Sequence, residues 1–251
     1  MATPSRYLRL PSQHLGRPVH LWTYGHWGLP VIAFPTASGM AHEWQSGGAI
    51  EALEPFFAAG RLKLYCPESN IAEAWSHADG PPGPRLARHE AYERFVRDEL
   101  IPWVAADSGG ASRVGVVGAS MGAWYACNFA LRNPEPVAWA LCLSGRYGLD
   151  RFFDAGVPAE LYYHQPLWYV PGLRGEARER VRRNTRFTFV VGTGPHEGGC
   201  VDETLAISRA MAAAGLPHLR DVWGRDSAHH WDWWKRQLHL HLHRLLPPPP
   251  S

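Results

Sequence analysis

Short apolar runs alternate with amphipathic stretches along most of this 251-residue chain. Near the N-terminus two runs alternate apolar and polar residues, as the half-buried strands of a hairpin do. Most later runs are continuously apolar, which is typical of strands that are buried on both faces of a parallel sheet. The predicted strands cover residues 7–10, 19–24, 29–34, 61–66, 113–117, 137–143, 187–192 and 219–223.

Helical patterns occupy most of the intervals between these strands. They cover residues 48–59, 89–106, 120–132, 202–214 and 231–246. Strands that alternate with helices favour a mostly parallel sheet with helices on both faces, here preceded by antiparallel strands. The fold class that we expect is therefore α/β.

Two stretches interrupt this alternation. Residues 70–88 contain the run Asp-Gly-Pro-Pro-Gly-Pro at 79–84, which predicts a loop. Residues 146–185 are rich in Pro, Gly, Tyr and Trp, and we interpret them as a cap-like excursion over the sheet. Because there is no internal repeat and no interdomain linker, we expect a single domain over residues 1–251.

Composition and charge indicate which kinds of binding partner, and which cellular compartment, we expect for this protein. The formal net charge is +2 and the basic residues are scattered, so neither nucleic acid nor an anionic membrane is expected as a partner. No apolar run reaches the ~18 residues of a membrane span, and the N-terminus lacks the pattern of a signal peptide. We therefore expect a cytoplasmic protein. Its four cysteines form no C-x-x-C pair and do not indicate a disulfide framework.

The strongest candidate for chemistry is Ser120, at the centre of the motif Gly-Ala-Ser-Met-Gly at 118–122. A β-branched run precedes the motif and a helix-like run follows it, which is the setting in which a strained turn projects a serine hydroxyl over a sheet. The amide of Met121, at the start of the helix, can stabilise an oxyanion. The competing interpretation is a tight turn in which Ser120 is only a helix N-cap.

A serine nucleophile needs a base, which in this arrangement follows the last strand. His229 and His230 lie in the loop directly after that strand, whereas His218 precedes it. His239 and His243 are four residues apart in the predicted final helix and could share a metal ion. A solvated helix end is the simpler interpretation, so no metal is expected.

The third member of such a set is a carboxylate that orients the imidazole. Glu197 is the first carboxylate after the strand that ends at residue 192. Asp202 is the alternative, although it also looks like the N-cap of the next helix. The second oxyanion donor is expected in the loop after the third strand. Pro35 has no amide hydrogen, so Thr36 or Ala37 must supply it.

Aromatic residues are the candidates for substrate binding, because such a wall suits an apolar, aromatic or sugar-bearing group. Packing of the cap is the simpler interpretation of the same residues, and an apolar cap would also suit the interface of a homo-oligomer. The candidates are Trp44, Trp75, Trp168, Tyr169 and Trp231.

Several of these segments together resemble the putative-esterase branch of the α/β-hydrolase superfamily, which includes esterase D, feruloyl esterases and antigen 85-like proteins. They are residues 31–36, 60–66, 118–123, 128–134, 143–145, 194–197 and 223–234. The family typically closes with His-Asp-Trp-x-x-Trp. Aligning Trp231 and Trp234 with that motif places His229 on the catalytic histidine and His230 where Asp is usual. The Gly-Pro-x-Glu loop resembles a subgroup in which glutamate replaces the usual aspartate.

The resemblance implies an α/β-hydrolase fold and a serine hydrolase that cleaves carboxylic esters through an acyl-enzyme on Ser120. We expect His229 to act as the base and Glu197 as the acid, with a small-molecule ester as substrate and no cofactor. Two alternatives stay open. One is an acyltransferase with the same triad, and the other is a catalytically silent protein that only binds a ligand or partner.

Overall fold

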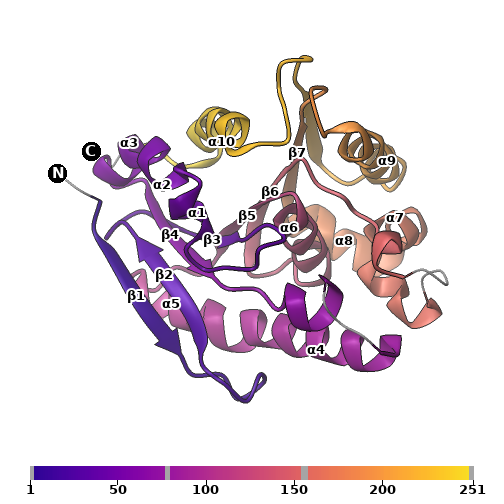
Figure 1. Cartoon of the computed structure of the whole chain (residues 1–251), viewed down its shortest axis with the longest axis horizontal. Coiled ribbons are helices and arrows are strands. Elements are labelled where there is room, and N and C mark those ends of the chain that lie inside the picture. The colour runs from indigo at the N-terminus through magenta and orange to yellow at the C-terminus, as the bar shows by residue number, and fades with distance from the viewer. Residues whose placement is uncertain (1–2, 77–79, 154–157, 249–251) are drawn as a thin grey trace.

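An eight-stranded sheet runs through the centre of the computed structural model (Figure 1). The structure describes residues 3–76, 80–153 and 158–248. The strand order is β1-β2-β4-β3-β5-β6-β7-β8. As predicted, the sheet is mostly parallel with an antiparallel start: β2 pairs antiparallel with both β1 and β4, and all other neighbours pair parallel. The strands are β1 (Ser5–Leu10), β2 (Val19–Tyr24), β3 (Leu29–Phe34), β4 (Leu62–Pro67), β5 (Val114–Ala119), β6 (Val137–Leu143), β7 (Arg186–Val191) and β8 (His218–Val222).

Helices cover both faces of the sheet (Figure 1). One apolar core lies between the sheet and α1 (Glu43–Ser46), α2 (Ala49–Ala52), α3 (Glu54–Ala58) and α10 (Trp231–Leu245). The other lies beneath α4 (Pro82–Arg94), the π-helix η2 (Phe95–Leu100), α5 (Ile101–Asp107), α6 (Met121–Arg132) and α9 (Gly198–Ala213). The central strands are buried on both sides, which explains their continuous apolar runs.

The loop expected over residues 70–88 is largely helical. A short π-helix, η1 (Ala72–Ser76), comes first, and α4 begins at Pro82. Proline fits the first turn of a helix because its missing N–H would have no partner there, so the proline-rich run starts a helix here instead of preventing one. From Pro82 the helical segments continue through η2 to the end of α5. Asp79 of the predicted loop lies outside the described residues.

The segment expected to form an excursion, residues 146–185, consists of short helices in its described part. These are η3 (Asp150–Phe152), η4 (Ala159–His164), α7 (Pro166–Tyr169), η5 (Val170–Gly172) and α8 (Gly175–Asn184). Several side-chain contacts attach it to α6. Trp124 Nε1 donates to the carbonyl of His164 at 3.2 Å, and the Tyr169 hydroxyl donates to Asn128 Oδ1 at 3.0 Å. Residues 154–157 of the segment lie outside the description.

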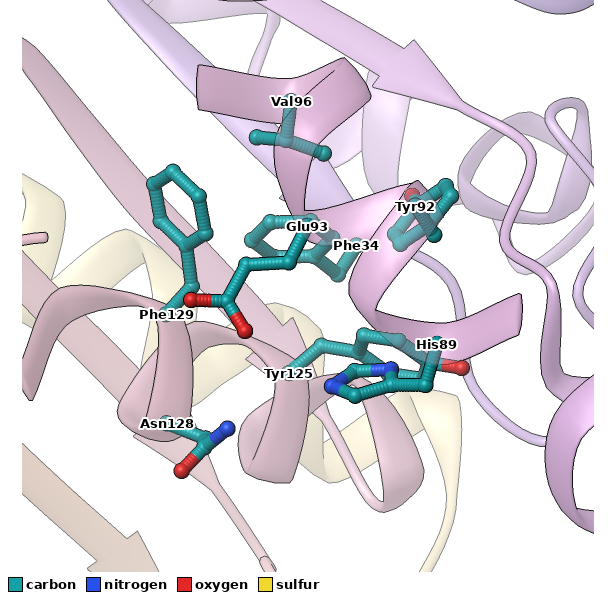
Figure 2. A pocket seen from close by; sticks show the side chains of 8 residues that line it. All are labelled: Phe34, His89, Tyr92, Glu93, Val96, Tyr125, Asn128 and Phe129. Atoms are coloured by element: carbon teal, nitrogen blue, oxygen red, sulfur yellow. The ribbon is translucent and has the colours of Figure 1, made fainter. Parts of the chain in front are cut away.

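A buried polar cluster lies where this segment meets α4 and α6. His89 and Glu93 of α4 line a small pocket together with Tyr125 and Asn128 of α6 (Figure 2). The ring of His164 packs 4.9 Å from that of His89, edge to face. Burial lowers the pKa of His89 well below its usual range and that of His164 to about 3, with a smaller contribution from the charge of Arg132. Both imidazoles are therefore neutral at pH 7.

Because these histidines are buried and neutral, we expect the free energy of unfolding of the protein to decrease in acid. In the unfolded chain each histidine takes up a proton below about pH 6.5, whereas the buried ring of His164 resists protonation. Stability therefore falls as the pH drops below 6.5, and His164 alone contributes on the order of 2 kcal/mol to this loss at pH 5. His164→Gln should shrink the difference in unfolding free energy between pH 7 and pH 5 by about that amount, measured by urea denaturation. The exposed control His243→Gln should leave the difference unchanged; an equal change in both variants would contradict the prediction.

Backbone packs directly against backbone where β5 turns into α6. A Cβ atom built on Gly122 would lie 2.6 Å from the carbonyl oxygens of both Phe34 and Pro35. One built on Gly118 would lie 2.1 Å from the carbonyl oxygen of Gly122. Only glycine at these positions allows the helix to approach the loop after β3 so closely.

Gly122→Ala should therefore destabilise the fold by about 1–3 kcal/mol, although alanine is the better helix former. The matched control is Gly83→Ala in the first turn of α4, where a Cβ meets nothing within 4 Å. That variant should be as stable as the wild type or slightly more stable. The measurement is the free energy of unfolding in urea, and wild-type stability of Gly122→Ala would show that the close approach is unimportant.

Candidate active site

Ser120 lies at the sharp turn between β5 and α6. Its backbone adopts φ 54° and ψ −118°, a conformation that side chains other than glycine rarely take. The amide of Ser120 donates to the carbonyl of Leu143 at 2.8 Å, which fixes the turn against the end of β6. The residue precedes the helix as expected, but its side chain makes no capping hydrogen bond. Its hydroxyl is instead engaged by a histidine.

His229 is that histidine. Its Nε2 lies 3.0 Å from Ser120 Oγ, and its backbone amide donates to the carbonyl of Pro195 at 3.0 Å. The adjacent His230 is exposed and serves another purpose: its Nδ1 accepts from the amide of Asp232 and caps α10. His218 lies in β8, where its Nε2 is 2.9 Å from Ser208 Oγ. The structure thus places His229, the histidine that the motif alignment favoured, next to Ser120.

Glu197 completes the set. It follows β7 at the N-terminus of α9, is fully buried, and places Oε2 3.3 Å from His229 Nδ1. The alternative acid, Asp202, is exposed within α9 and away from this contact. The expectation that Asp202 caps this helix is wrong, because α9 already begins at Gly198. The two glycines at 198 and 199 hid that helical turn in the sequence pattern.

Two further residues hold Glu197 in place, and the sequence analysis assigned neither of them this role. Ser144, at the end of β6, donates its hydroxyl to Glu197 Oε1 at 2.5 Å. Trp234 of α10 donates its indole N–H to Ser144 Oγ at 2.9 Å. A signal did exist, since Ser144 follows a strand between those that carry Ser120 and Glu197, and parallel strands end at one edge of the sheet.

The expected oxyanion donors differ in their surroundings. The amide of Thr36 donates to a carboxylate oxygen of Glu43 at 2.8 Å, and the Thr36 hydroxyl contacts the other oxygen of the same group. Thr36 is therefore already engaged. The amides of Ala37 and Met121 have no hydrogen-bond partner among the residues that the structure describes. This arrangement favours Ala37 over Thr36 as the partner of Met121.

Most of the aromatic residues considered for substrate binding belong to the core. The indole of Trp44 is buried and donates to the carbonyl of Phe34 at 3.1 Å. Trp75 is buried against the rings of His89 and Trp124. Tyr169 of α7 is buried against α6, where its hydroxyl donates to Asn128. These three residues thus pack in the core, in line with the simpler of the two interpretations given for them.

The two remaining aromatic candidates are more accessible. Trp231 is half-buried, with its ring 5.4 Å from that of Trp44. Trp168 is 38% exposed and keeps a surface that a ligand could contact.

Two groups of described side chains bring together atoms of the kind that bind metals. Each group has its ligand atoms within 4.8 Å of one another. In the cluster described above, Arg132 already donates to both carboxylate oxygens of Glu93. The second group contains a thiol next to the candidate triad: Cys200 Sγ lies 3.7 Å from Nδ1 of His229, which also contacts Glu197. Burial raises the pKa of this thiol to about 12, with a smaller contribution from the charge of Glu197. The groups are His89, Glu93 and His164, and Glu197, Cys200 and His229.

Comparison with known structures shows the fold. A ferulic acid esterase superposes with a TM-score of 0.72 at 17% identity, covering 96% of each chain. MPT51 of Mycobacterium tuberculosis gives 0.72 at 16% identity over 96% of this chain and 97% of that one. The fluorophosphonate-binding serine hydrolase F of Staphylococcus aureus gives 0.75 at 13% identity over 98% and 99%. These likenesses confirm the α/β-hydrolase fold.

Comparison with sequences shows the family. No curated protein sequence matches this chain. Within the described residues, no helix combines the length and apolar character needed to cross a membrane. The model of the family described as "Putative esterase" matches residues 66–245, a stretch that includes the serine, the glutamate and the histidine discussed above. Since that match spans well over half of the sequence, this chain belongs to the esterase family that the model describes.

Proposed function

We propose that this protein is a serine hydrolase that cleaves carboxylic esters through an acyl-enzyme on Ser120. The observation that carries the proposal is the continuous chain of contacts from Ser120 Oγ to His229 Nε2 at 3.0 Å and from His229 Nδ1 to Glu197 Oε2 at 3.3 Å. Nucleophile, base and acid follow β5, β8 and β7, so rigid strands position all three. Membership of an esterase family is consistent with this chemistry.

Acylation begins when Ser120 Oγ attacks the ester carbonyl carbon. His229 Nε2 accepts the hydroxyl proton, while its Nδ1–H donates to Glu197 and the carboxylate stabilises the imidazolium that forms. The amides of Met121 and Ala37 are the donors for the oxyanion, and being backbone groups they are oriented before the substrate arrives. The alcohol then leaves with the proton that His229 returns to it, and the acyl group stays on Ser120.

Deacylation repeats these steps with water as the nucleophile. His229 removes a proton from the water, the oxyanion forms at the same donors, and the carboxylic acid departs as Ser120 recovers its proton. Glu197 keeps its charge throughout. A buried carboxylate needs hydrogen-bond donors to be tolerated, and Ser144 supplies one on the side away from His229.

The assignment of the nucleophile predicts the behaviour of Ser120→Ala. This variant should lose roughly 10⁴-fold or more in kcat toward an aryl ester, because no other group can form the acyl-enzyme. A fluorophosphonate probe should add one adduct to the wild type and none to Ser120→Ala, measured by intact mass. The exposed Ser46→Ala provides the matched control and should label normally. Labelling of Ser120→Ala, or its full activity, would refute the assignment.

The choice of acid predicts opposite outcomes for two conservative changes. Glu197→Gln removes the charge beside His229 Nδ1 and should lower kcat about 10³- to 10⁴-fold. Asp202→Asn alters an exposed side chain on α9 and should leave kcat within about twofold of the wild type. Steady-state kinetics with one aryl ester checks both, with circular dichroism to establish that each variant is folded. A severe loss in Asp202→Asn alone would transfer the role to Asp202.

A further inference from the structure

A thiol lies against the triad at the ring nitrogen that faces away from Ser120. Cys200 belongs to the first turn of α9, and its Sγ is 3.7 Å from His229 Nδ1. The same Nδ1 is 3.3 Å from Glu197 Oε2. Three different ligand types, a thiol, an imidazole and a carboxylate, therefore converge on one point. The proposed ester hydrolysis uses the imidazole and the carboxylate but assigns nothing to the thiol.

Two of the three separations between these atoms match those of a tetrahedral zinc site, and the third, between Cys200 Sγ and a carboxylate oxygen of Glu197, is within 4.8 Å. With Zn–S near 2.3 Å, Zn–N near 2.0–2.1 Å and Zn–O near 2.0–2.2 Å, tetrahedral angles place sulfur and nitrogen about 3.6 Å apart and nitrogen and oxygen about 3.4 Å apart. The structure has 3.7 Å and 3.3 Å. A charge-assisted N–H···O hydrogen bond is usually shorter, about 2.7–2.9 Å. The ligands thus need little movement to receive a metal ion.

Charge balance also favours a divalent cation at this point. A thiolate and a carboxylate together neutralise one divalent ion, and the imidazole adds no charge, so no net charge is buried. This matters because Glu197 is 0% and Cys200 5% exposed. Nearby Arg146 is paired with Glu203 and leaves the two anionic ligands to the metal. In the His89 cluster, by contrast, Arg132 already neutralises Glu93, so a divalent ion would add uncompensated charge.

We propose that Glu197, Cys200 and His229 form an inhibitory binding site for a thiophilic divalent metal such as Zn²⁺. Bonds form from the metal to Cys200 Sγ, His229 Nδ1 and Glu197 Oε2. The thiol proton is released to solvent, as coordination of a thiol requires. The Nδ1 proton is displaced, and the neutral imidazole carries its proton on Nε2 instead.

This change of tautomer explains the inhibition. Nε2 is the atom that faces Ser120 Oγ at 3.0 Å, and once it is protonated it can only donate to the hydroxyl. The base can no longer accept the serine proton, so acylation stops without any contact between the metal and the serine. The inhibitory effect rests on the proposed esterase mechanism, whereas the metal site depends only on its three ligands.

The ligand set also specifies which ions act. Thiolate and imidazole select Zn²⁺ and similar soft or borderline ions, whereas Mg²⁺ prefers oxygen ligands and keeps its water. Of the three ligands only His229 has substantial exposure, with 21% of its side chain accessible, so we expect a metal ion to enter past its ring.

Inhibition is tested by titrating Zn²⁺ into the protein during hydrolysis of an aryl ester, with each variant compared to its own metal-free rate. At a concentration about ten times the dissociation constant, Zn²⁺ should lower the wild-type rate about tenfold by mass action, and a chelator should restore it. Cys200→Ala should resist that concentration, while the buried-thiol control Cys66→Ala should be inhibited like the wild type. Mg²⁺ should have no effect. Equal inhibition of Cys200→Ala and the wild type would overturn the proposal.

Metal binding is tested separately from activity with Co²⁺ as the probe. Thiolate ligation should give a sulfur-to-cobalt charge-transfer absorption band in the wild type and in Ser120→Ala, and Zn²⁺ should remove it by displacement. The band should be absent in Cys200→Ala and in Cys200→Ser, the second variant guarding against misfolding of the first. A band in a wild type without esterase activity would refute the proposed function and leave the site intact. Esterase activity without a Cys200-dependent band would refute the site alone.

Discussion

The contact between the backbone of Gly122 and the carbonyl groups of Phe34 and Pro35 sets the geometry on which the site depends. Because Gly122 has no Cβ, the first turn of α6 sits directly against the loop after β3. That proximity brings the amide of Met121 close to the loop that holds the amide of Ala37. At the same turn Ser120 adopts a positive φ, and its hydroxyl lies 3.0 Å from His229 Nε2. The strain at Ser120 is balanced by the packing around it.

The parallel sheet does the rest of the positioning. Ser120, Ser144, Glu197 and His229 follow β5, β6, β7 and β8, which are consecutive neighbours in the sheet. Residues far apart in the chain therefore meet at one edge, where the strands end at their carboxyl side. The loops after β7 and β8 are held together as well, since a Cβ on Gly192 would lie 2.0 Å from the carbonyl oxygen of Ser227. The acid and the base are thereby fixed relative to each other.

The sequence predicted the features that follow from local pattern and chain order. The strands, the turn at Ser120 and the position of His229 after the last strand are of this kind. Other features depend on distant contacts that no local pattern contains. Thr36 could not be separated from Ala37 without knowing that Glu43 accepts its amide. Burial of Trp44 was equally hidden, because a tryptophan has the same apolar character in a core as in a binding wall.

The hydrogen bond from Trp234 to Ser144 has a consequence for the order of events during synthesis. Trp234 belongs to α10, which follows all eight strands among the described residues, and it donates to the serine that holds Glu197. His229 also precedes this helix directly. A nascent chain can form most of the sheet from earlier segments, but Glu197 and His229 acquire their positions only when α10 docks. The proposed catalytic set is therefore complete only once α10 has docked, and a chain that lacks α10 should leave Glu197 and His229 without fixed positions even if the sheet forms.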